Sequence, residues 1–184
     1  MTTSFIGALL LASLLTSTGT TGTAATTKDT INMEKENIGS LVALYPKPLT
    51  VVGAEVNGKV NWLVVGHTGI IGHNRIILSM NDKHYTNKGI HQTGRLSINL
   101  VSREMLPKAD YAGSVSGADT DKSTLFAYHI GENGAPLIDE SPLSMECKVV
   151  DEFKTDGFDN FICEVAATYV AKDMLNENGR PDYT

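Results

Sequence analysis

Short runs in which apolar and polar residues alternate dominate the chain from Ser40 onward. Alternation of this kind places successive side chains on opposite faces of a strand, so it is typical of β-structure. The segment 49–66, LTVVGAEVNGKVNWLVVG, contains two β-branched runs separated by Asn57 and Gly58. An Asn-Gly pair between two such runs predicts a β-hairpin.

Four further segments continue the strand pattern. In the second of them, apolar residues alternate with the polar residues Ser97 and Asn99. The last two are joined by the turn sequence 154–159, KTDGFD, which predicts a paired antiparallel ribbon. The four segments are 75–80 (RIILSM), 95–101 (RLSINLV), 143–153 (LSMECKVVDEF) and 160–171 (NFICEVAATYVA).

Helical patterning is limited to two short segments. The sequence YTNKGIHQTG predicts a helix from about Thr86 to Gly94, and SREMLPKADYAG predicts another. In the second, Ser102 is the expected cap and Glu104 lies in the first turn. Because no strand is followed by a long amphipathic helix, a parallel doubly wound sheet is disfavoured. The pattern predicts a mainly β fold, an antiparallel barrel or sandwich.

The size and charge of the chain narrow the classes of function. Its 184 residues, 41% of them hydrophobic, suffice for one domain with a substantial core. Lys and Arg number 15 against 21 Asp and Glu, a formal net charge of -6, and the charges are spread along the chain. A groove for nucleic acid needs clustered Lys and Arg, so we expect no nucleic-acid partner.

Residues 1–32 differ in composition from the rest. The apolar run 5–15, FIGALLLASLL, is too short to span a bilayer as a helix. The small residues that follow it suit a signal peptidase, whereas the leading MTTS lacks the positive charge of a signal peptide. Two interpretations stay open, a signal peptide and a disordered or non-native extension before Met33. Residues 33–184 are the predicted domain.

The two cysteines, Cys147 and Cys163, each alternate with apolar neighbours, which predicts buried thiols that face the core. A disulfide between adjacent strands is the alternative. Neither cysteine lies where a positive charge or a helix start would activate it, and no G-x-S-x-G sequence occurs. We therefore expect no catalytic nucleophile.

The histidines do not show the spacing of a metal site. No HExxH sequence and no CxxC pair occurs, so we expect the histidines at strand ends or on the surface and no metal. The segment 66–73, GHTGIIGH, matches neither G-x-G-x-x-G nor G-x-x-x-x-G-K-S/T. On spacing alone, it is either a corner of the barrel or a binding loop. The histidines concerned are His67, His73, His84 and His91.

One cluster has the chemistry of an anion site. Lys83, His84, Tyr85 and Thr86 come directly after a strand and before the expected helix start. A lysine, a hydroxyl and free backbone N–H groups are what a phosphate monoester requires. The turn 114–123, SVSGADTDKS, adds further hydroxyls and a lysine. From spacing alone, solvated surface loops are the alternative.

Read in order, these segments resemble the flavin reductase-like, FMN-binding split-barrel family, and in particular its flavoredoxin-type members. The resemblance extends over residues 44–183, and the order and spacing of the set make it specific. The matching sequences are LYPKPLTVVGAEVNGKVN, VVGHTG, SMNDKHYTNKGI, LSINLVS, YAGSVSGADTDKS, APLIDESPLSMECKVV and ENGRPDY.

This resemblance implies a six-stranded antiparallel split barrel of Greek-key type that forms a homodimer and binds FMN near the subunit interface. It also implies the residues of the flavin site. Those expected along the flavin ring are Asn61, Val64, Val65, Gly66, His67 and Thr68. Those expected at the phosphate or ribityl chain are Lys83, His84, Tyr85 and Thr86, and those expected to complete the pocket are Asn99, Ser116, Gly117, Asp121 and Lys122.

The implied function is electron transfer through bound FMN, with no catalytic side chain, between NAD(P)H or a carrier protein and an acceptor. The alternatives are an NAD(P)H:flavin oxidoreductase and a flavin-binding protein without turnover. A location in the cytoplasm is favoured over export, because an exported chain would have to acquire FMN outside. Many relatives carry a tryptophan at His67 and an arginine at Asn81, and relatives continue past Thr184. We therefore expect altered ring stacking, a weaker phosphate charge, and impaired dimerisation or flavin retention.

Overall fold

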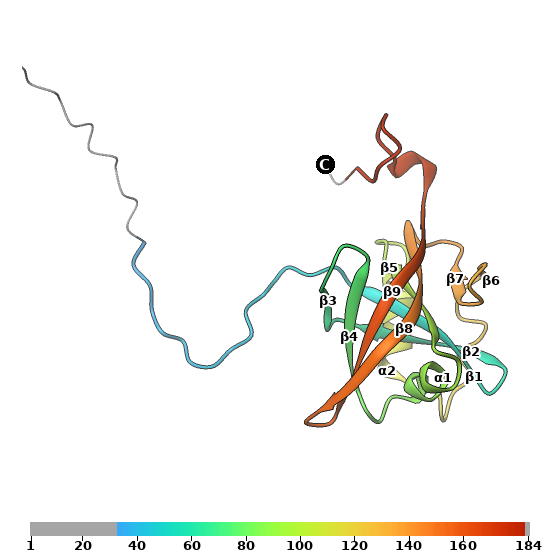
Figure 1. Ribbon diagram of the computed structural model, residues 1–184, viewed down its shortest axis with the longest axis horizontal. Helices are drawn as coiled ribbons and strands as arrows, with labels where there is room; N and C mark the ends of the chain where they lie inside the picture. The colour runs from blue at the N-terminus through green and yellow to red at the C-terminus, as the bar shows by residue number, and fades with distance from the viewer. Residues whose placement is uncertain (1–32, 183–184) are drawn as a thin grey trace, which may run out of the picture. The chain divides into compact units, whose positions relative to one another are not determined.

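The computed structural model describes residues 33–182 of the chain. Contacts divide the chain into two units between Val42 and Ala43. No helix or strand lies in residues 33–42, whereas residues 43–182 contain the elements labelled in Figure 1. The extension 1–32 lies outside the described residues, so both interpretations of it stay predictions.

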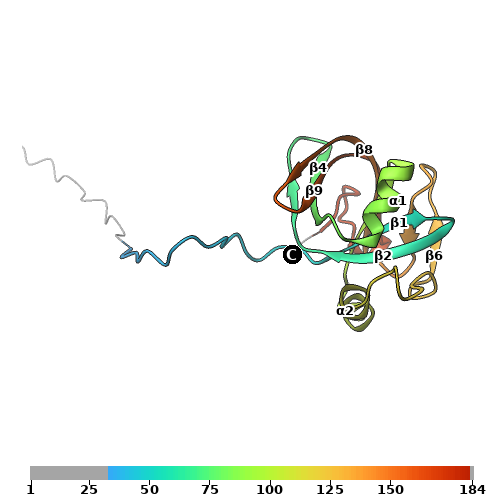
Figure 2. The ribbon, with the colours of Figure 1, turned by 90° about the horizontal axis from the view of Figure 1, so that it is seen from below.

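The main sheet of the described chain has seven strands in the order β2-β1-β5-β8-β9-β4-β3, and every neighbouring pair is antiparallel. It curls into an open barrel (Figure 2), which confirms the predicted antiparallel split barrel. The seventh strand is the three-residue β3, which pairs with β4 at the sheet edge. The strands are β1 (Thr50–Val56), β2 (Lys59–Val65), β3 (Thr68–Ile70), β4 (Arg75–Asn81), β5 (Arg95–Leu100), β8 (Leu143–Thr155) and β9 (Phe158–Val170). A separate two-stranded sheet pairs β6 (Tyr128–Ile130) with β7 (Pro136–Ile138).

The predicted hairpin at Asn57 and Gly58 is confirmed. Both residues have positive φ, 52° and 78°, and Val56 pairs with Lys59 across the turn. Two consecutive positive φ values match the right-handed twist of the flanking strands, and Asn-Gly tolerates them at little cost. The turn therefore fixes the register of β1 against β2.

The predicted ribbon is the pair β8 and β9, which turns at Asp156 and Gly157. Register shifts between Glu146 and Cys147 and again between Val149 and Asp151 interrupt its ladder. Such bulges increase the local twist and bend the strands. They allow β8 to pair with β5 on one side while β9 pairs with β4 on the other, which helps to curl the sheet.

The first helix agrees with its prediction and the second begins later. α1 (Tyr85–Thr93) ends at Gly94, which has a φ of 63°. α2 (Leu106–Ser114) begins after the expected cap, because Ser102 accepts the Met105 N–H at 3.4 Å in a turn that precedes the helix. Pro107 then occupies the first turn of α2. A backbone N–H there would have no partner within the helix, so proline removes no helical hydrogen bond. A short 3-10 helix, η1 (Lys172–Met174), follows β9.

Two apolar clusters lie on opposite faces of β1 and β2, and one helix belongs to each (Figure 2). Inside the barrel, Ile90 of α1 packs with Val52 and the other interior side chains. On the outer face, Trp62 packs edge-on to Phe126, with ring centroids 5.6 Å apart, and α2 adds small side chains. Because β1 and β2 are buried on both faces, their apolar runs are nearly continuous.

Cys147 and Cys163 lie in the barrel interior as free, buried thiols, as predicted. Burial raises the pKa of the Cys163 thiol to about 12, and it moves the pKa of Cys147 upward as well. Since the thiolate is the reactive form, both side chains behave as packing groups.

Candidate functional site

The turn between β4 and α1 is held by Asn81. Its side-chain Oδ1 accepts the Lys83 N–H at 3.0 Å, and its carbonyl accepts the His84 N–H at 3.0 Å. His84 is the N-cap of α1, and no side chain caps the helix by a hydrogen bond. First-turn N–H groups have no partner within their helix, so this end of α1 presents donors and the positive end of the helix dipole.

Lys122 supplies a buried positive charge to the same region. Its side chain is 3% exposed, and Nζ donates to the carbonyls of Ala112 at 2.9 Å and Val115 at 3.0 Å. Within residues 33–182 it forms no ion pair with a carboxylate. Loss of solvation lowers its pKa. An ammonium has three donors, so one N–H of Lys122 is available to a ligand.

His84, the N-cap of α1, lines the same cavity as this lysine. Partial burial, and secondarily the charge of Lys122, lower its pKa below the ordinary value of 6.5. Both effects oppose a second positive charge at this position. The neutral imidazole therefore predominates at neutral pH, and it offers one donor and one acceptor.

Three elements converge through a short hydrogen bond and a close backbone approach. Asn61 of β2 donates through Nδ2 to Thr86 Oγ1 of α1 at 2.7 Å, and both side chains are buried. Gly117, which follows α2, lies so close that a Cβ there would meet Asn61 Oδ1 at 2.1 Å. Only glycine fits this approach. The contact brings the turn that carries Lys122 against the start of α1.

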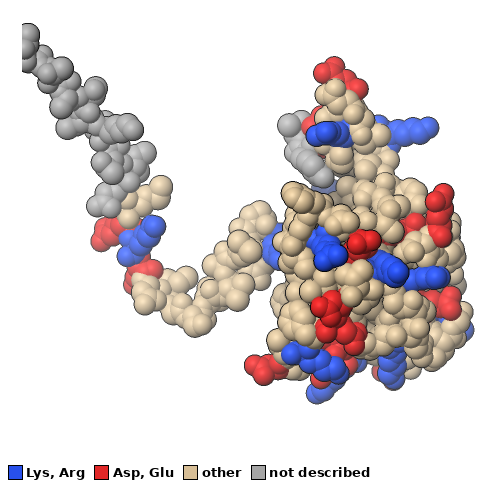
Figure 3. All heavy atoms as spheres, viewed as in Figure 1, with Lys and Arg blue, Asp and Glu red and all other residues tan. Residues whose placement is uncertain are grey.

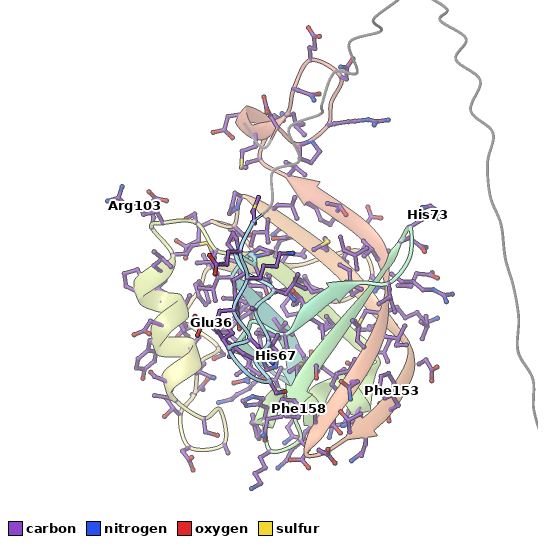
Figure 4. The ribbon with its side chains drawn as sticks, turned by 90° about the vertical axis from the view of Figure 1, so that its left-hand side faces the viewer. Glu36, His67, His73, Arg103, Phe153 and Phe158 are labelled. Carbon is purple, nitrogen blue, oxygen red and sulfur yellow. The ribbon has the colours of Figure 1, made fainter. Side chains whose placement is uncertain are left out.

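A first cavity of about 210 Å³ opens beside this junction. Its walls are polar and apolar in nearly equal measure, and they include the end of β2 and Phe158 at the start of β9. Figure 4 shows His67 and Phe158 side by side, and their ring centroids are 5.8 Å apart. The lining residues are Val64, Val65, Gly66, His67, Ser79, Met80, Asn81, His84 and Phe158.

A second cavity of about 270 Å³ adjoins the first, because Asn81 and His84 line both. It is more polar than the first, and it includes the start of α1 and the buried Lys122. Its remaining lining residues are Asn61, Leu63, Lys83, Tyr85, Thr86, Gly113, Ser114, Val115, Ser116 and Gly117. The two cavities together form one groove, with Val64, Met80 and Phe158 at one end and Lys83 and Lys122 at the other.

The structure brings twelve of the fifteen predicted site residues to this groove. They are Asn61, Val64, Val65, Gly66, His67, Lys83, His84, Tyr85, Thr86, Ser116, Gly117 and Lys122. Asp121 lies in an adjoining third cavity, where its carboxylate pairs with Lys59 at 2.7 Å.

The other two predicted residues, Thr68 and Asn99, line none of the three cavities. The carbonyl of Thr68 accepts a hydrogen bond from the Lys47 ammonium. Asn99 is fully buried, and its Nδ2 donates to the Val51 carbonyl at 3.0 Å. Its Oδ1 accepts the Ile138 N–H at 3.1 Å and the Ser144 hydroxyl at 2.7 Å. These bonds tie β5 to β1, β7 and β8, and they engage the whole amide of Asn99.

Several residues that line the groove were not among the predicted site residues. They differ in how far the local sequence could have indicated them. Asn81 carries a local signal, because an asparagine directly after a strand often bonds the backbone two residues later. Phe158 carries none, since it reaches the groove only because β9 pairs with β4, with Phe158 opposite Asn81. Local sequence cannot report such a pairing between distant segments.

Other kinds of site find little support in the described chain. Across residues 33–182, no group of three or more His, Cys, Asp or Glu side chains is arranged to hold a metal ion. His73 lies on the turn between β3 and β4, away from His67 (Figure 4). On the face shown in Figure 3, basic and acidic side chains are interspersed and form no basic stripe. None of the described helices is both long enough and apolar enough to cross a membrane.

Comparison with known families decides the membership of the chain. The model of the flavin reductase like domain matches residues 42–182, which include every cavity described above. The chain belongs to the flavin reductase-like family.

Several solved structures are similar to the chain. Flavoredoxin from Methanosarcina acetivorans is 37% identical, with a TM-score of 0.76 over 82% of each chain. Flavoredoxin of Desulfovibrio vulgaris is 30% identical, with a TM-score of 0.75 over 81% of this chain and 83% of that one. An FMN-binding protein from Thermus thermophilus, 21% identical with a TM-score of 0.71 over 82% and 85%, shares the fold.

A curated relative, an uncharacterized protein from Aeropyrum pernix, is 28% identical over 141 residues. The match covers 71% of this chain but 52% of the relative, so the chain spans about half the length of the curated relative it matches.

Proposed function

We propose that this chain binds FMN in the groove formed by the first and second cavities and transfers electrons through it. The observation that carries the proposal is the buried Lys122, which lines the groove and whose ammonium has no carboxylate partner among the described residues. A buried cation without a counter-charge is costly, and a bound phosphate would offset that cost.

The groove fits FMN at both of its ends. The phosphate end combines Lys122 with the uncapped start of α1 and with the hydroxyls of Thr86 and Ser116. Charge-assisted and helix-terminal hydrogen bonds of this kind favour a phosphate dianion. The other end, with Val64, Met80 and Phe158, offers the apolar slot that a flat ring system requires.

When bound, FMN would supply the redox chemistry, as a two-electron carrier that can also pass single electrons. The residues of the chain then bind, orient and shield the ring. His84 lines both cavities and is neutral at neutral pH, so it can hold a hydrogen bond to a bound flavin without adding charge. His67, where many relatives carry a tryptophan, gives the first cavity a polar ring beside Phe158.

The oligomeric state and the electron donor also belong to this proposal. Family membership supports a homodimer with the flavin near the interface, and either NAD(P)H or an electron-carrier protein as donor. The flavoredoxin likeness favours a carrier protein over NAD(P)H. Sedimentation analysis of the full chain, with and without FMN, tests the dimer.

Binding of riboflavin and FMN to the full chain tests the flavin assignment, with flavin fluorescence as the readout. We expect FMN to bind about tenfold or more tightly than riboflavin, because a charge-assisted hydrogen bond contributes ~1.5–3 kcal/mol. Equal affinities would contradict the assignment of the phosphate to Lys122. A folded chain that binds neither compound would contradict the proposed function.

Anaerobic reduction then separates the modes of turnover. Rapid bleaching of the bound flavin by NADH would indicate an NAD(P)H:flavin oxidoreductase. Bleaching only by a reduced carrier protein supports the electron-transfer role proposed here. Tight binding with no reduction by either donor would indicate a flavin-binding protein without turnover.

A further inference from the structure

A fourth cavity, separate from the groove, lies between the small sheet of β6 and β7 and the open end of the β8–β9 ribbon. It has a volume of about 230 Å³ and shares no lining residue with the first three cavities. Ser144 of β8 and Tyr169 of β9 are directly opposite each other in the ladder, so their side chains are on the same face of the ribbon. Leu137, Ile138 and Val170 add apolar surface to the cavity.

The two serine hydroxyls of this cavity have already used their donors. The Ser144 hydroxyl donates to Asn99 Oδ1 at 2.7 Å, and the Ser141 hydroxyl donates to the Leu143 carbonyl at 2.8 Å. A hydroxyl has one donor and two acceptor lone pairs. Each of these oxygens can therefore accept a hydrogen bond from a ligand, but it can donate one only by giving up its present partner.

The phenol of Tyr169 is committed in the same way. Its hydroxyl donates to Glu146 Oε2 at 3.0 Å, and this hydrogen bond raises the pKa of Tyr169, so the proton stays in place. Glu146 is fully buried, and within residues 33–182 it forms no ion pair with a basic side chain. The phenol oxygen therefore has only acceptor capacity left, and a carboxyl group without a cation lies next to it.

His129 and Asp139 contribute a hydrogen-bonded pair to the lining. Nδ1 of His129 lies 2.6 Å from Asp139 Oδ1. A carboxylate only accepts, so Nδ1 carries a proton, and the neutral imidazole then offers a lone pair at Nε2. The described residues that line this cavity include no lysine and no arginine. The lining thus combines several acceptors, one carboxylate and apolar surface.

We propose that the fourth cavity binds a small primary amine as its ammonium ion, with the apolar part of the amine against Leu137, Ile138 and Val170. An ammonium carries three donors and no acceptor, so it supplies what this lining lacks. Its positive charge is favoured by the Asp139 carboxylate and by the aromatic ring of Tyr169. An alcohol of the same shape brings one donor and no charge, and a carboxylate brings only acceptors. The site is independent of flavin binding, because the cavity shares no lining residue with the groove.

Titration of the full, isotope-labelled chain with benzylamine tests the site, with the NMR shifts of the backbone amides as the readout. Benzyl alcohol and benzoate are probes of matched shape. At neutral pH we expect benzylamine to saturate with a dissociation constant on the order of 1 mM, a value typical of a ligand this small. Benzyl alcohol should bind about fivefold or more weakly, and benzoate should not saturate. Benzylamine that fails to saturate, equal affinities for the amine and the alcohol, or shifts centred away from β7 and the end of β9 would each overturn the inference.

Asp139→Asn removes the charge of the lining and keeps an oxygen that can accept the His129 N–H. We expect the affinity for benzylamine to fall about tenfold, while the affinity for benzyl alcohol changes less than about twofold. Asp151→Asn, at an exposed position of β8 outside the four cavities, makes the same change in net charge and should alter neither affinity. An equal loss for the amine and the alcohol in Asp139→Asn would show that the cavity had changed shape, and it would contradict the ammonium assignment.

Tyr169→Phe keeps the aromatic ring and removes the acceptor oxygen. We expect a loss of benzylamine affinity of about threefold or more, with FMN affinity changed less than about twofold, since Tyr169 does not line the groove. Unchanged benzylamine affinity in this variant would contradict the phenol oxygen as an acceptor for the ammonium. A wild-type chain that binds benzylamine but not FMN would support this inference while it contradicts the proposed function, so the two can fail separately.

Discussion

Replacing Lys122 with methionine should separate FMN binding from riboflavin binding. Methionine is unbranched and about as long as lysine, so it fills the same buried space without the charge. The wild-type ammonium is 3% exposed and uses two donors on the carbonyls of Ala112 and Val115. Only a ligand with a phosphate at this position should respond to the loss of its third donor.

The magnitude follows from the buried setting of this ammonium. A hydrogen bond to a charged group contributes ~1.5–3 kcal/mol, which corresponds to a loss of FMN affinity of roughly 10- to 100-fold. Riboflavin lacks the phosphate, so its affinity should change less than about threefold. The unliganded variant loses two hydrogen bonds, but it also loses the desolvation cost of a buried cation. Its free energy of unfolding should therefore change by less than about 2 kcal/mol.

Fluorescence titration of both flavins against wild type and variant measures these effects, with urea unfolding as the check on stability. Lys148→Met, at an exposed position of β8, is the control with the same change in net charge. Equal losses for FMN and riboflavin would show that the pocket had changed shape, and the assignment would fail. Unaltered FMN affinity would show that the phosphate binds elsewhere.

Three other predictions follow from the structure. Because the folded pKa of His84 lies below its unfolded value of 6.5, the unfolded chain takes up protons first, and stability should fall as pH drops below 6.5. His84→Gln should reduce that fall in urea titrations across pH 5–7, and an unchanged slope would argue against a partly buried, neutral imidazole. Gly117→Ala places a Cβ 2.1 Å from Asn61 Oδ1 and should cost ~1–3 kcal/mol of stability, whereas at Gly72 the nearest side-chain atom is 3.7 Å away and alanine should be tolerated. Asn99→Ala leaves buried hydrogen-bond donors without an acceptor. It should lower the free energy of unfolding by ~2–4 kcal/mol, while FMN affinity stays within about twofold. A loss of FMN affinity without a loss of stability in Asn99→Ala would instead support the direct flavin contact that the family resemblance implied.

The elements with strong local signals were predicted correctly. The Asn57-Gly58 turn, the ribbon of β8 and β9, and the helix that ends at Gly94 each depend on residues close in sequence. The second helix was misplaced at its start, because Ser102 caps a turn instead of the helix. Local hydrogen-bonding groups can serve either structure, and only the packing of the surrounding chain selects one.

For the site, sequence and structure contributed different parts. The cluster Lys83–Thr86 at a helix start was predicted as an anion site from its residue types and its position after a strand. Ser97 and Asn99 were also visible as a polar face of a strand, but not as a buried one, because that depends on β7 and β8 covering it.

The sequence by itself therefore determined the six long strands, the hairpin register and the polar groups that precede α1, since a period of two and turn residues act over a few positions. The three-residue strands β3, β6 and β7 were not predicted. Only the tertiary structure decided that Lys122 loses its solvent, that Phe158 stands opposite Asn81, and that the groove continues toward Lys59. Each of these depends on segments far apart in the chain. Curling of the sheet brings such segments together, and no local pattern encodes the distance between them.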